Sequence, residues 1–280
     1  MIATIGLPVY NGDLFIESCI QSILNQTFSD FELLITDDGS TDRTEEIVLS
    51  FKDERIKWFS DGLNKGISYR LNQQIAMAKG KFFIRMDADD IMFSDRLEKQ
   101  ISFLNNHNVD VIGSNAVVID DKNKILGFRE CSLPSSFKDV YKKVLFIHPT
   151  VAGKTEWFRT YKYREGLAGV EDFDLWIRSC FYSSFHIISE PLLFYRDPLI
   201  FSFKKYAYRQ KQLRKCLIKN FTMSNFLLLV YVFILSYFKQ LVLFSAFLTK
   251  ANTLLVSKRN QSLKKQEKDA FDKILHNIID

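Results

Sequence analysis

Short apolar runs alternate with amphipathic stretches along the first two thirds of the chain, and this rhythm constrains the fold more than any other feature. Strands that alternate with helices form βαβ units around a mostly parallel sheet. The sequence therefore predicts an α/β fold with a Rossmann-like sheet flanked by helices. Strands are expected at 2–7, 31–36, 56–59, 81–86, 109–118 and 185–195, and helices at 14–25, 43–51, 66–78, 94–105 and 173–181.

Polar loops follow three of the expected strands. They are residues 8–12 (PVYNG), 37–40 (DDGS) and 87–90 (DADD). The carboxyl ends of parallel strands share one edge of a sheet, and ligands of open α/β sheets bind there. Turn formation and helix capping explain any one loop. The three loops together favour a ligand site.

The loop at residues 87–90 is a candidate metal site. Asp87 and Asp89 are two residues apart, so on an extended segment both side chains point the same way. Clustered carboxylates repel one another unless a cation or a donor-rich ligand compensates. Mg2+ and Mn2+ prefer carboxylate, water and phosphate oxygens, and either ion would suit this pair. Capping of the next helix, by Ser94 or Asp95, explains Asp95 better than it explains Asp87 or Asp89.

The loop at residues 37–40 offers hydrogen-bond acceptors. Asp37 and Asp38 cannot both cap the following helix, because residues 40–42 lie nearer its start. One carboxylate is therefore expected to be free to accept from a ligand, such as the imide N–H of a pyrimidine base. Tyr10 could stack on that base, and core packing of its ring is an equal alternative.

Charge is distributed unevenly along the 280 residues. From residue 201 onward, 15 Lys and Arg stand against 4 Asp and Glu, a balance of +11, whereas residues 1–200 carry 23 against 29. The basic segment is rich in Phe, Leu and Tyr, which suits an anionic membrane face. No nucleic-acid motif accompanies it, so no nucleic-acid partner is expected. The composition change places a domain boundary near residue 201, between a body at 1–200 and a helical, basic and apolar tail at 201–280.

The tail contains an interrupted apolar run. Residues 226–238 are fewer than the roughly 20 needed to span a bilayer, and extension to residue 248 places Lys239 near the centre. An interfacial helix is therefore expected at 226–248, with a membrane span, packing on the body and dimerisation as alternatives. The cations expected beside anionic headgroups are Lys204, Lys205, Arg209, Lys211, Arg214, Lys215 and Lys219.

Two further features bear on location. The four cysteines form no CxxC pair, so neither a zinc site nor a disulfide framework is indicated. The segment MIATIGLPVYNG has no basic stretch followed by a long apolar run, so no secretory signal is expected. We expect a cytoplasmic protein that is peripheral at the inner face of the cell membrane.

The motifs together resemble those of a known family. PVYNG, FELLITDDGSTDRT, NKGISYRLNQQIAMAKG, MDADDI and GVEDFDLWIR are similar, in this order, to segments of the family 2 inverting glycosyltransferases of the GT-A fold. A lone DxD motif is weak, but the ordered set across residues 1–200 is specific. The resemblance implies a nucleotide-sugar donor, most often a UDP-sugar, and a divalent metal. A membrane location would suit a lipid-linked saccharide as the acceptor.

The resemblance also implies a nucleotide site. The loop from Pro8 to Tyr10 and the carboxylate of Asp38 would bind the nucleotide. Asn64 and Gly66 would lie near it.

Catalytic and metal-binding roles follow from the same resemblance. Asp87 and Asp89 would form the DxD element at the nucleotide sugar, with Asp89 the more direct metal ligand. Asp172 would be the general base that takes the proton of the acceptor hydroxyl, opposite the leaving diphosphate, and Glu171 would orient or tune it. A helix N-terminus also favours acidic residues, so the position of this pair alone does not distinguish a catalytic role from a structural one. His148 is read as structural, with contact to donor or acceptor as the alternative.

The sequence departs from the family in two ways. It lacks the QxxRW element of processive members and several long apolar spans, which favours a single addition. After the base the family usually continues with Tyr-Arg-His, whereas residues 194–198 read FYRDP. Two other classes remain as alternatives: a non-catalytic sugar-nucleotide or glycan-binding module, and a nucleotidyltransferase. A binding module does not need Asp172, and residues 8–13 lack the basic side chains of a triphosphate loop.

Overall fold

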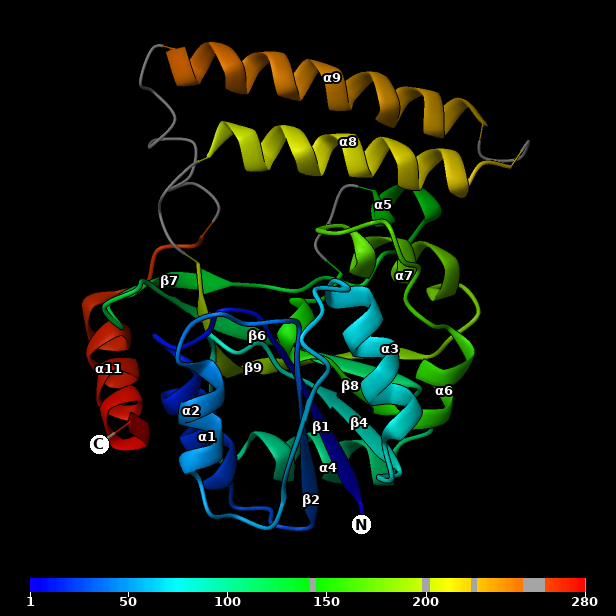
Figure 1. The fold of residues 1–280 in the computed structure, drawn as a ribbon. Coiled ribbons are helices and arrows are strands. Elements are labelled where there is room, and N and C mark those ends of the chain that lie inside the picture. The colour runs from blue at the N-terminus through cyan, green and yellow to red at the C-terminus, as the bar shows by residue number, and fades with distance from the viewer. Residues whose placement is uncertain (142–144, 198–201, 223–225, 249–259, 280) are drawn as a thin grey trace.

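One mixed sheet forms the centre of the protein in the computed structural model, which describes residues 1–141, 145–197, 202–222, 226–248 and 260–279 (Figure 1). Along the sheet the strands are β3 (Ile56–Ser60), β2 (Phe31–Asp37), β1 (Ala3–Val9), β4 (Phe82–Arg85), β8 (Ala152–Lys154), β6 (Val111–Ile119), β9 (Phe185–Arg196) and β5 (Ile91–Met92), and β7 (Ile125–Arg129) pairs with β6.

The expected parallel order holds for the half of the sheet formed by β3, β2, β1 and β4, whereas the other described strands pair in both directions. β1 is parallel to β2 and β4, β2 is parallel to β3, and β6 is parallel to β9. β8 is antiparallel to both β4 and β6, and β5 is antiparallel to β9. Val9 pairs with Asp37 at the end of the β1–β2 ladder, so the loops that follow these two strands leave the sheet at the same edge.

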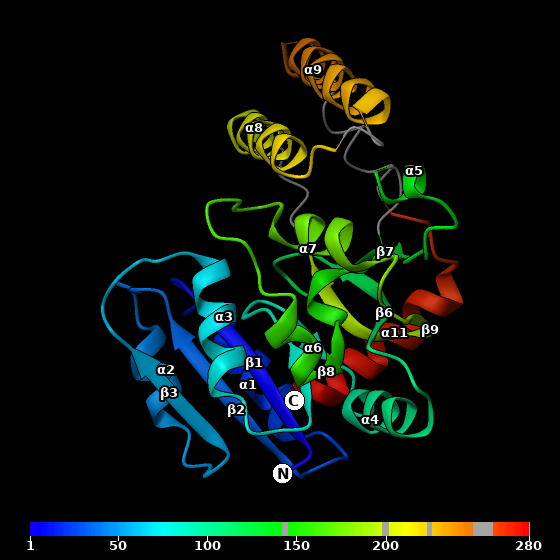
Figure 2. The same ribbon diagram turned by 90° about the vertical axis from the view of Figure 1, so that its right-hand side faces the viewer.

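Helices cover both faces of the sheet. α1 (Ile16–Leu24), α2 (Thr44–Ser50) and α4 (Arg96–Asn106) bury apolar side chains against the face that carries Ile5 and Leu7. α3 (Ile67–Met77), α6 (Thr155–Thr160) and α7 (Glu171–Ser179) pack on the opposite face, around Phe83. Figure 2 shows α3 and α6 next to each other on that side. Apolar residues at helical spacing, such as Ile16, Ile20 and Ile23, are buried and hold these helices in place.

The expected elements lie within two residues of their predicted bounds. The elements that were missed have six residues or fewer: β5, β7, β8, α5 (Phe137–Val140), α6 and a 3-10 turn at His148–Thr150. They are too short for a periodic pattern. The expected side-chain cap on α4 is also corrected. Asp95 occupies the N-cap position without a capping hydrogen bond and instead pairs with Lys99 at 2.8 Å.

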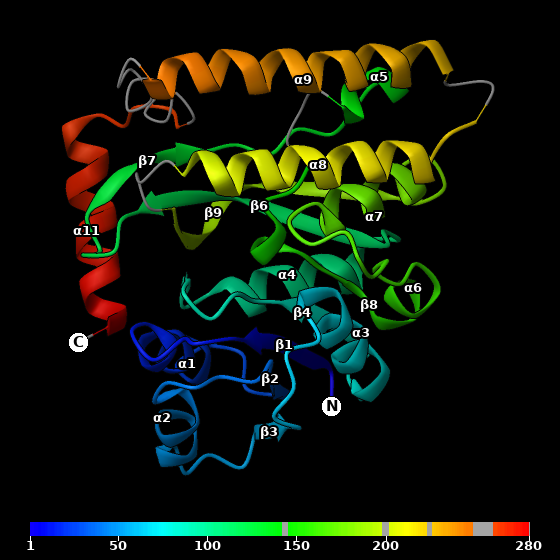
Figure 3. The ribbon, with the colours of Figure 1, turned by 45° about the horizontal axis from the view of Figure 1, so that its top comes forward.

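Two long helices follow the body and lie side by side. α8 (Phe203–Lys219) packs on α7 through Cys216, and α9 (Phe226–Leu248) lies on the far side of α8 (Figures 1 and 3). Arg214 of α8 donates to Ser236 Oγ at 3.0 Å and to Gln240 Oε1 at 3.2 Å. We call α8 and α9 the hairpin.

The helix α9 is continuous and mostly exposed. It runs through Lys239 and Gln240, where the sequence suggests an interruption, because Lys239 is exposed and Gln240 accepts a hydrogen bond from Arg214. By length and composition, residues 226–245 could cross a membrane, and only 17% of this apolar window is buried. A helix from the core of a soluble protein is mostly buried. α9 therefore presents apolar surface that the described part of the chain leaves uncovered.

The last helix, α11 (Lys265–Ile279), returns to the body (Figure 3). Its Leu275 is fully buried in a cluster with Ile91, Phe93 and Phe194. The expected tail at 201–280 thus contains two different parts, a hairpin outside the body and a helix packed on it.

Candidate active site

Hydrogen bonds join the three polar loops at the edge of the sheet. Asn11 N donates to Ser40 Oγ at 2.9 Å, which links the loops after β1 and β2. Cys19 Sγ, from α1, donates to Asp87 O at 3.3 Å and anchors the loop after β4. The loops that the sequence places at the ends of three separate strands therefore form one continuous surface.

Three carboxylates converge after β4. One oxygen from each of Asp87, Asp89 and Asp90 lies within 4.8 Å of the other two. Asp90 is fully buried, and its Oδ1 accepts from Arg196 N at 2.8 Å, whereas Oδ2 has no hydrogen-bond partner in the described part of the chain. Burial and the charge of Asp87 raise the pKa of Asp89 to about 6. The carboxylates thus lie close enough to disfavour one another's charge, and the orphaned oxygen of Asp90 fits a divalent ion.

Arg196 positions the acidic loop. Its Nε donates to Asp89 O at 2.8 Å and its Nη2 to Asn123 Oδ1 at 2.7 Å, while its guanidinium lies 4.2 Å from the centre of the Phe15 ring. The sequence points to this residue only as part of a departure from the family's Tyr-Arg-His segment. The structure shows that it contacts the acidic loop directly.

Arg85 connects the acidic cluster to the start of α7. Its side chain is 3% exposed, and Nη1 lies 2.5 Å from Asp87 Oδ2. Its Nε has no hydrogen-bond partner among the described residues. Burial raises the pKa of Glu171 to about 7 and also raises the pKa of Asp172, and the charge of Arg85 opposes both shifts. One buried cation therefore pairs with Asp87 and also opposes the rise in the pKa of two carboxyls from a distant part of the sequence.

Glu171 and Asp172 form the first turn of α7. Glu171 is buried, and its Oε2 accepts from Gly169 N at 2.5 Å, while Asp172 Oδ1 accepts from Phe173 N at 2.7 Å. Arg209 of α8 donates from Nε to Gly169 O at 3.2 Å, and its charge also opposes the rise in the pKa of Asp172. The hairpin thus reaches the loop that carries the expected base.

His148 lies inside the body. Its Nε2 is 2.8 Å from the hydroxyl of Tyr163, and the two residues are buried. Burial and the charge of Arg85 lower the pKa of His148 well below its ordinary value. A neutral imidazole paired with a tyrosine agrees with the structural interpretation of this residue.

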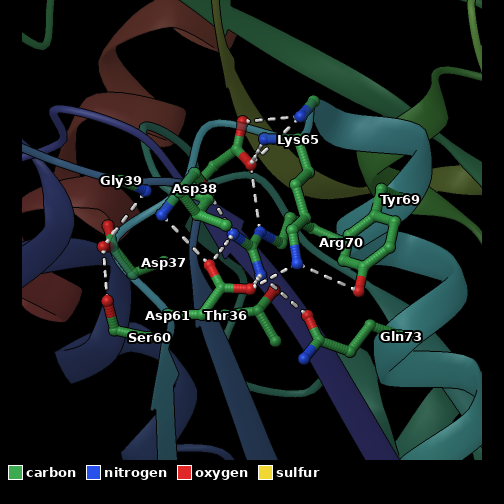
Figure 4. Close-up of polar contacts among 12 residues, drawn as sticks. Thr36, Asp37, Asp38, Gly39, Ser60, Asp61, Lys65, Tyr69, Arg70 and Gln73 are labelled. Carbon is green, nitrogen blue, oxygen red and sulfur yellow. Dashed lines mark hydrogen bonds and ion pairs between the residues drawn. The ribbon is translucent and has the colours of Figure 1, made fainter.

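Asp38 lies at the centre of a second polar network, drawn in Figure 4. Its Oδ1 accepts from Arg70 Nε at 3.0 Å and from Lys65 N at 2.8 Å, and its Oδ2 accepts from Gly66 N at 3.0 Å. Arg70 is 1% exposed and also pairs with Asp61 at 2.6 Å. Asp38 therefore fixes the segment from Asp61 to Gly66 beside the sheet edge.

Both Asp37 and Asp38 accept hydrogen bonds from the protein, so a ligand would have to share their carboxylate oxygens. Asp37 accepts from Gly39 N at 3.2 Å and from Ser60 Oγ at 2.9 Å, and Asp38 accepts the donors described above. Both carboxylates are buried, so each must be satisfied within the protein. A ligand at Asp38 would share an oxygen that already accepts a backbone N–H.

The remaining expected nucleotide-binding residues lie around this network. Pro8 is buried at the end of β1, Gly66 begins α3 with φ of 85°, and Asn64 is exposed. Tyr10 is 54% exposed, so core packing does not account for its ring. Gly39 brings the loop after β2 against the backbone of Asn64, where a Cβ atom would lie 3.1 Å from the Asn64 nitrogen. Tyr10 and Asn64 are therefore accessible beside Asp38.

Relatives of this chain are glycosyltransferases. An uncharacterized glycosyltransferase of Methanocaldococcus jannaschii, MJ1057, is 34% identical over 209 residues, which are 70% of this chain and 71% of that protein. The Escherichia coli enzyme named UDP-Glc:alpha-D-GlcNAc-diphosphoundecaprenol beta-1,3-glucosyltransferase WfgD is 36% identical over 126 residues, 45% of this chain and 49% of that enzyme.

Solved structures share the fold. S. aureus TarS 1–349 in complex with UDP-GlcNAc superposes with a TM-score of 0.66 at 19% identity, over 85% of this chain and 73% of that one. The mannosyltransferase PcManGT from Pyrobaculum calidifontis, in complex with GDP-Man and Mn2+, superposes with a TM-score of 0.59 at 16% identity. The match covers 99% of this chain and 84% of that one. The family model of glycosyl transferase family 2 matches residues 4–167. This chain therefore belongs to glycosyl transferase family 2 and has the GT-A fold.

Proposed function

We propose that this glycosyltransferase moves one sugar from a nucleotide-diphosphate sugar, a UDP-sugar, to an acceptor hydroxyl with inversion. Family membership favours transfer over a binding module or a nucleotidyltransferase. The choice of UDP is supported by the relative WfgD, whose name specifies UDP-Glc, and by the TarS complex with UDP-GlcNAc. No QxxRW element occurs in the sequence, which favours a single addition over processive synthesis.

The position of Arg85 is the observation that carries this proposal. It pairs with Asp87 of the acidic cluster, and its charge acts on Asp172 at the start of α7. Two carboxylate groups with different tasks must lie near one reacting centre in an inverting transferase. Asp172 would accept the proton of the acceptor hydroxyl as that oxygen attacks the sugar, and Glu171 would tune its basicity.

The acidic cluster fits a divalent ion. Asp89 and Asp87 would hold Mn2+ or Mg2+, and the unpartnered Oδ2 of Asp90 makes this residue a further candidate. When bound, the ion would neutralise charge on the departing diphosphate. Arg196 holds the backbone of Asp89, which keeps the ligand set in place before the ion arrives.

The nucleotide would bind along the same edge. Tyr10 would stack on the base, while Pro8 shapes the loop that carries it. Asp38 would accept from the base through Oδ2, and Asn64 and Gly66 would line the segment that Asp38 holds.

Membrane association is the second part of the proposal. Residues 1–200 would be the catalytic domain, and the hairpin within 201–280 would bind the inner face of the cell membrane. Cations exposed on α8 would meet anionic headgroups, and the apolar surface of α9 would enter the interface. A lipid-linked saccharide, of the kind that the name of WfgD specifies, would then be the acceptor in surface polysaccharide or glycolipid assembly.

A donor screen tests the proposal. Purified protein with Mn2+ is incubated with a panel of UDP-, GDP- and dTDP-sugars, and release of the nucleotide diphosphate is measured. We expect a UDP-sugar to be used and EDTA to abolish its use, with activity restored by Mn2+ or Mg2+. Use of a GDP- or dTDP-sugar alone would exclude UDP as the carrier, and undiminished turnover in EDTA would exclude the metal.

A further inference from the structure

The helix α8 carries seven cations and no acidic residue, and its exposed cations lie on different sides of the helix. Lys204, Lys211 and Lys215 recur at helical spacing on one exposed stripe. Arg209 lies about 120° round the helix from Lys215, since the two are six residues apart. It therefore points to a different side, toward the body.

Arg209 differs from those lysines because it reaches the active site. Its Nε donates to Gly169 O at 3.2 Å, and Gly169 N donates to Glu171 Oε2, so the backbone of this glycine links Arg209 to the acidic pair. Its charge acts on Asp172. No described residue is recorded as a partner of its two terminal nitrogens, and the side chain is exposed. A guanidinium fork is thus available beside the proposed base.

The order of the elements matches the parts of an amphiphilic substrate. Going inward, the apolar helix α9 comes first, the cationic helix α8 second, and α7 with Asp172 third (Figures 1 and 2). A lipid that carries a sugar through phosphate groups has the same order: an apolar chain, an anionic link and a hydroxyl. Each part would meet the protein surface that suits its chemistry.

We propose that Arg209 binds the phosphate of a lipid-diphosphate saccharide acceptor and so places its sugar hydroxyl at Asp172. The proposal rests on the function proposed above and adds the part of the acceptor that is recognised, its phosphate link, and the residue that binds it. Arginine forms paired, charge-assisted hydrogen bonds to phosphate, a geometry that lysine does not provide. The exposed lysine stripe would instead bind the phosphates of membrane headgroups, which carry no saccharide.

A binding experiment with the full chain tests this site. The protein in neutral detergent micelles, saturated with UDP and Mn2+ to block the donor site, is titrated calorimetrically with geranylgeranyl diphosphate. Geranylgeraniol and inorganic diphosphate are the controls, because each lacks one part of the probe. We expect the diphosphate lipid to bind at least about tenfold more tightly than either control.

Matched variants assign the binding to one residue. Arg209→Gln should weaken geranylgeranyl diphosphate binding about tenfold, since it removes a charge-assisted contact, and Arg209→Lys should restore part of the affinity. Lys215→Gln removes the same charge from the other side of α8 and should change the affinity less than twofold. UDP binding should be the same in all variants.

Several results would overturn the proposal. Equal weakening by Arg209→Gln and Lys215→Gln would show general attraction to anionic headgroups, and tight binding of inorganic diphosphate would show a site for free phosphate. Loss of UDP binding in Arg209→Gln would show that the substitution disturbs the body as a whole and does not act on phosphate binding alone. Failure of the proposed function would instead appear as unused donors in the unaltered protein, which the lipid titration does not measure.

Discussion

The body and the hairpin differ in the burial of their charged side chains. In the body, Asp90, Glu171 and Arg85 are buried, and each acts on other charged groups at short range. On the hairpin, Lys204, Lys211 and other cations are exposed on a helix without acidic residues. Burial makes electrostatic interactions strong and fixed, whereas exposure leaves charge available to a second surface. The body is thus built to act on a bound molecule, and the hairpin to meet something outside the protein.

The sharpest way to break this comparison is to remove the proposed base from the body. Asp172→Asn should lower the rate of sugar transfer about 10²- to 10⁴-fold, the usual contribution of a general base. UDP binding should stay within about twofold, because the residues proposed to bind the metal and the nucleotide lie on other elements. Steady-state transfer and calorimetric UDP binding measure the two effects. Unchanged turnover would remove Asp172 from the mechanism.

A pair of leucines tests whether α11 belongs to the body and α9 does not. Leu275 of α11 is fully buried and Leu241 of α9 is 67% exposed. Leu275→Ala should lower the free energy of unfolding by about 2–5 kcal/mol, because it leaves a cavity. Leu241→Ala should change it by less than about 0.5 kcal/mol. Urea unfolding measures both, and equal effects would contradict the division of the tail.

The pH dependence of stability tests the buried charge of the body. The pKa of Glu171 is raised from its ordinary value of 4.5 to about 7 in the folded protein. Burial and the charge of Asp172 raise it, and the charge of Arg85 opposes the rise. Between these values the folded state binds more protons than the unfolded state, so this carboxyl makes the protein less stable as pH rises. Glu171→Gln should remove this loss of stability. The free energy of unfolding should therefore rise by up to about 3 kcal/mol at pH 8 and by little at pH 5.

The exposed Glu165 provides the matched control for this measurement. Glu165→Gln should leave the pH dependence of unfolding unchanged, since an exposed carboxyl loses little hydration on folding. If Glu171→Gln and the unaltered protein showed the same pH dependence, Glu171 would not titrate in the way that its burial requires.

The sequence predicted the sheet and its polar edge because these follow from local patterns. Apolar runs fix the strands, and their parallel order brings the loops after β1, β2 and β4 to one side. Contacts between distant residues could not be predicted in this way. Arg85 reads as part of a buried strand, and only the fold shows that it faces Asp87 and acts on Asp172.

The same limit applies to the acidic cluster and the tail. Spacing selects Asp87 and Asp89, but the burial of Asp90 and its unpartnered oxygen depend on β9 and Arg196, more than 100 residues later. The composition of residues 201–280 gives a basic, apolar segment without showing that Leu275 packs among Ile91 and Phe194. Deletion of the whole segment would therefore damage the body as well as remove the hairpin.

Point substitutions on α9 give a cleaner test of the hairpin. Ile234 and Phe238 are four residues apart, so they share one face of the helix, and both are more than 60% exposed. Ile234→Glu with Phe238→Glu should weaken binding to phosphatidylglycerol-containing vesicles at least about tenfold, because apolar contact is lost and charge repulsion is added. Leu49→Glu, at a leucine of α2 that is 51% exposed, should leave binding unchanged. Vesicle sedimentation measures all three proteins, and if the α9 variant bound as well as the Leu49 variant, the uncovered apolar face of the hairpin would not be the surface that meets the membrane.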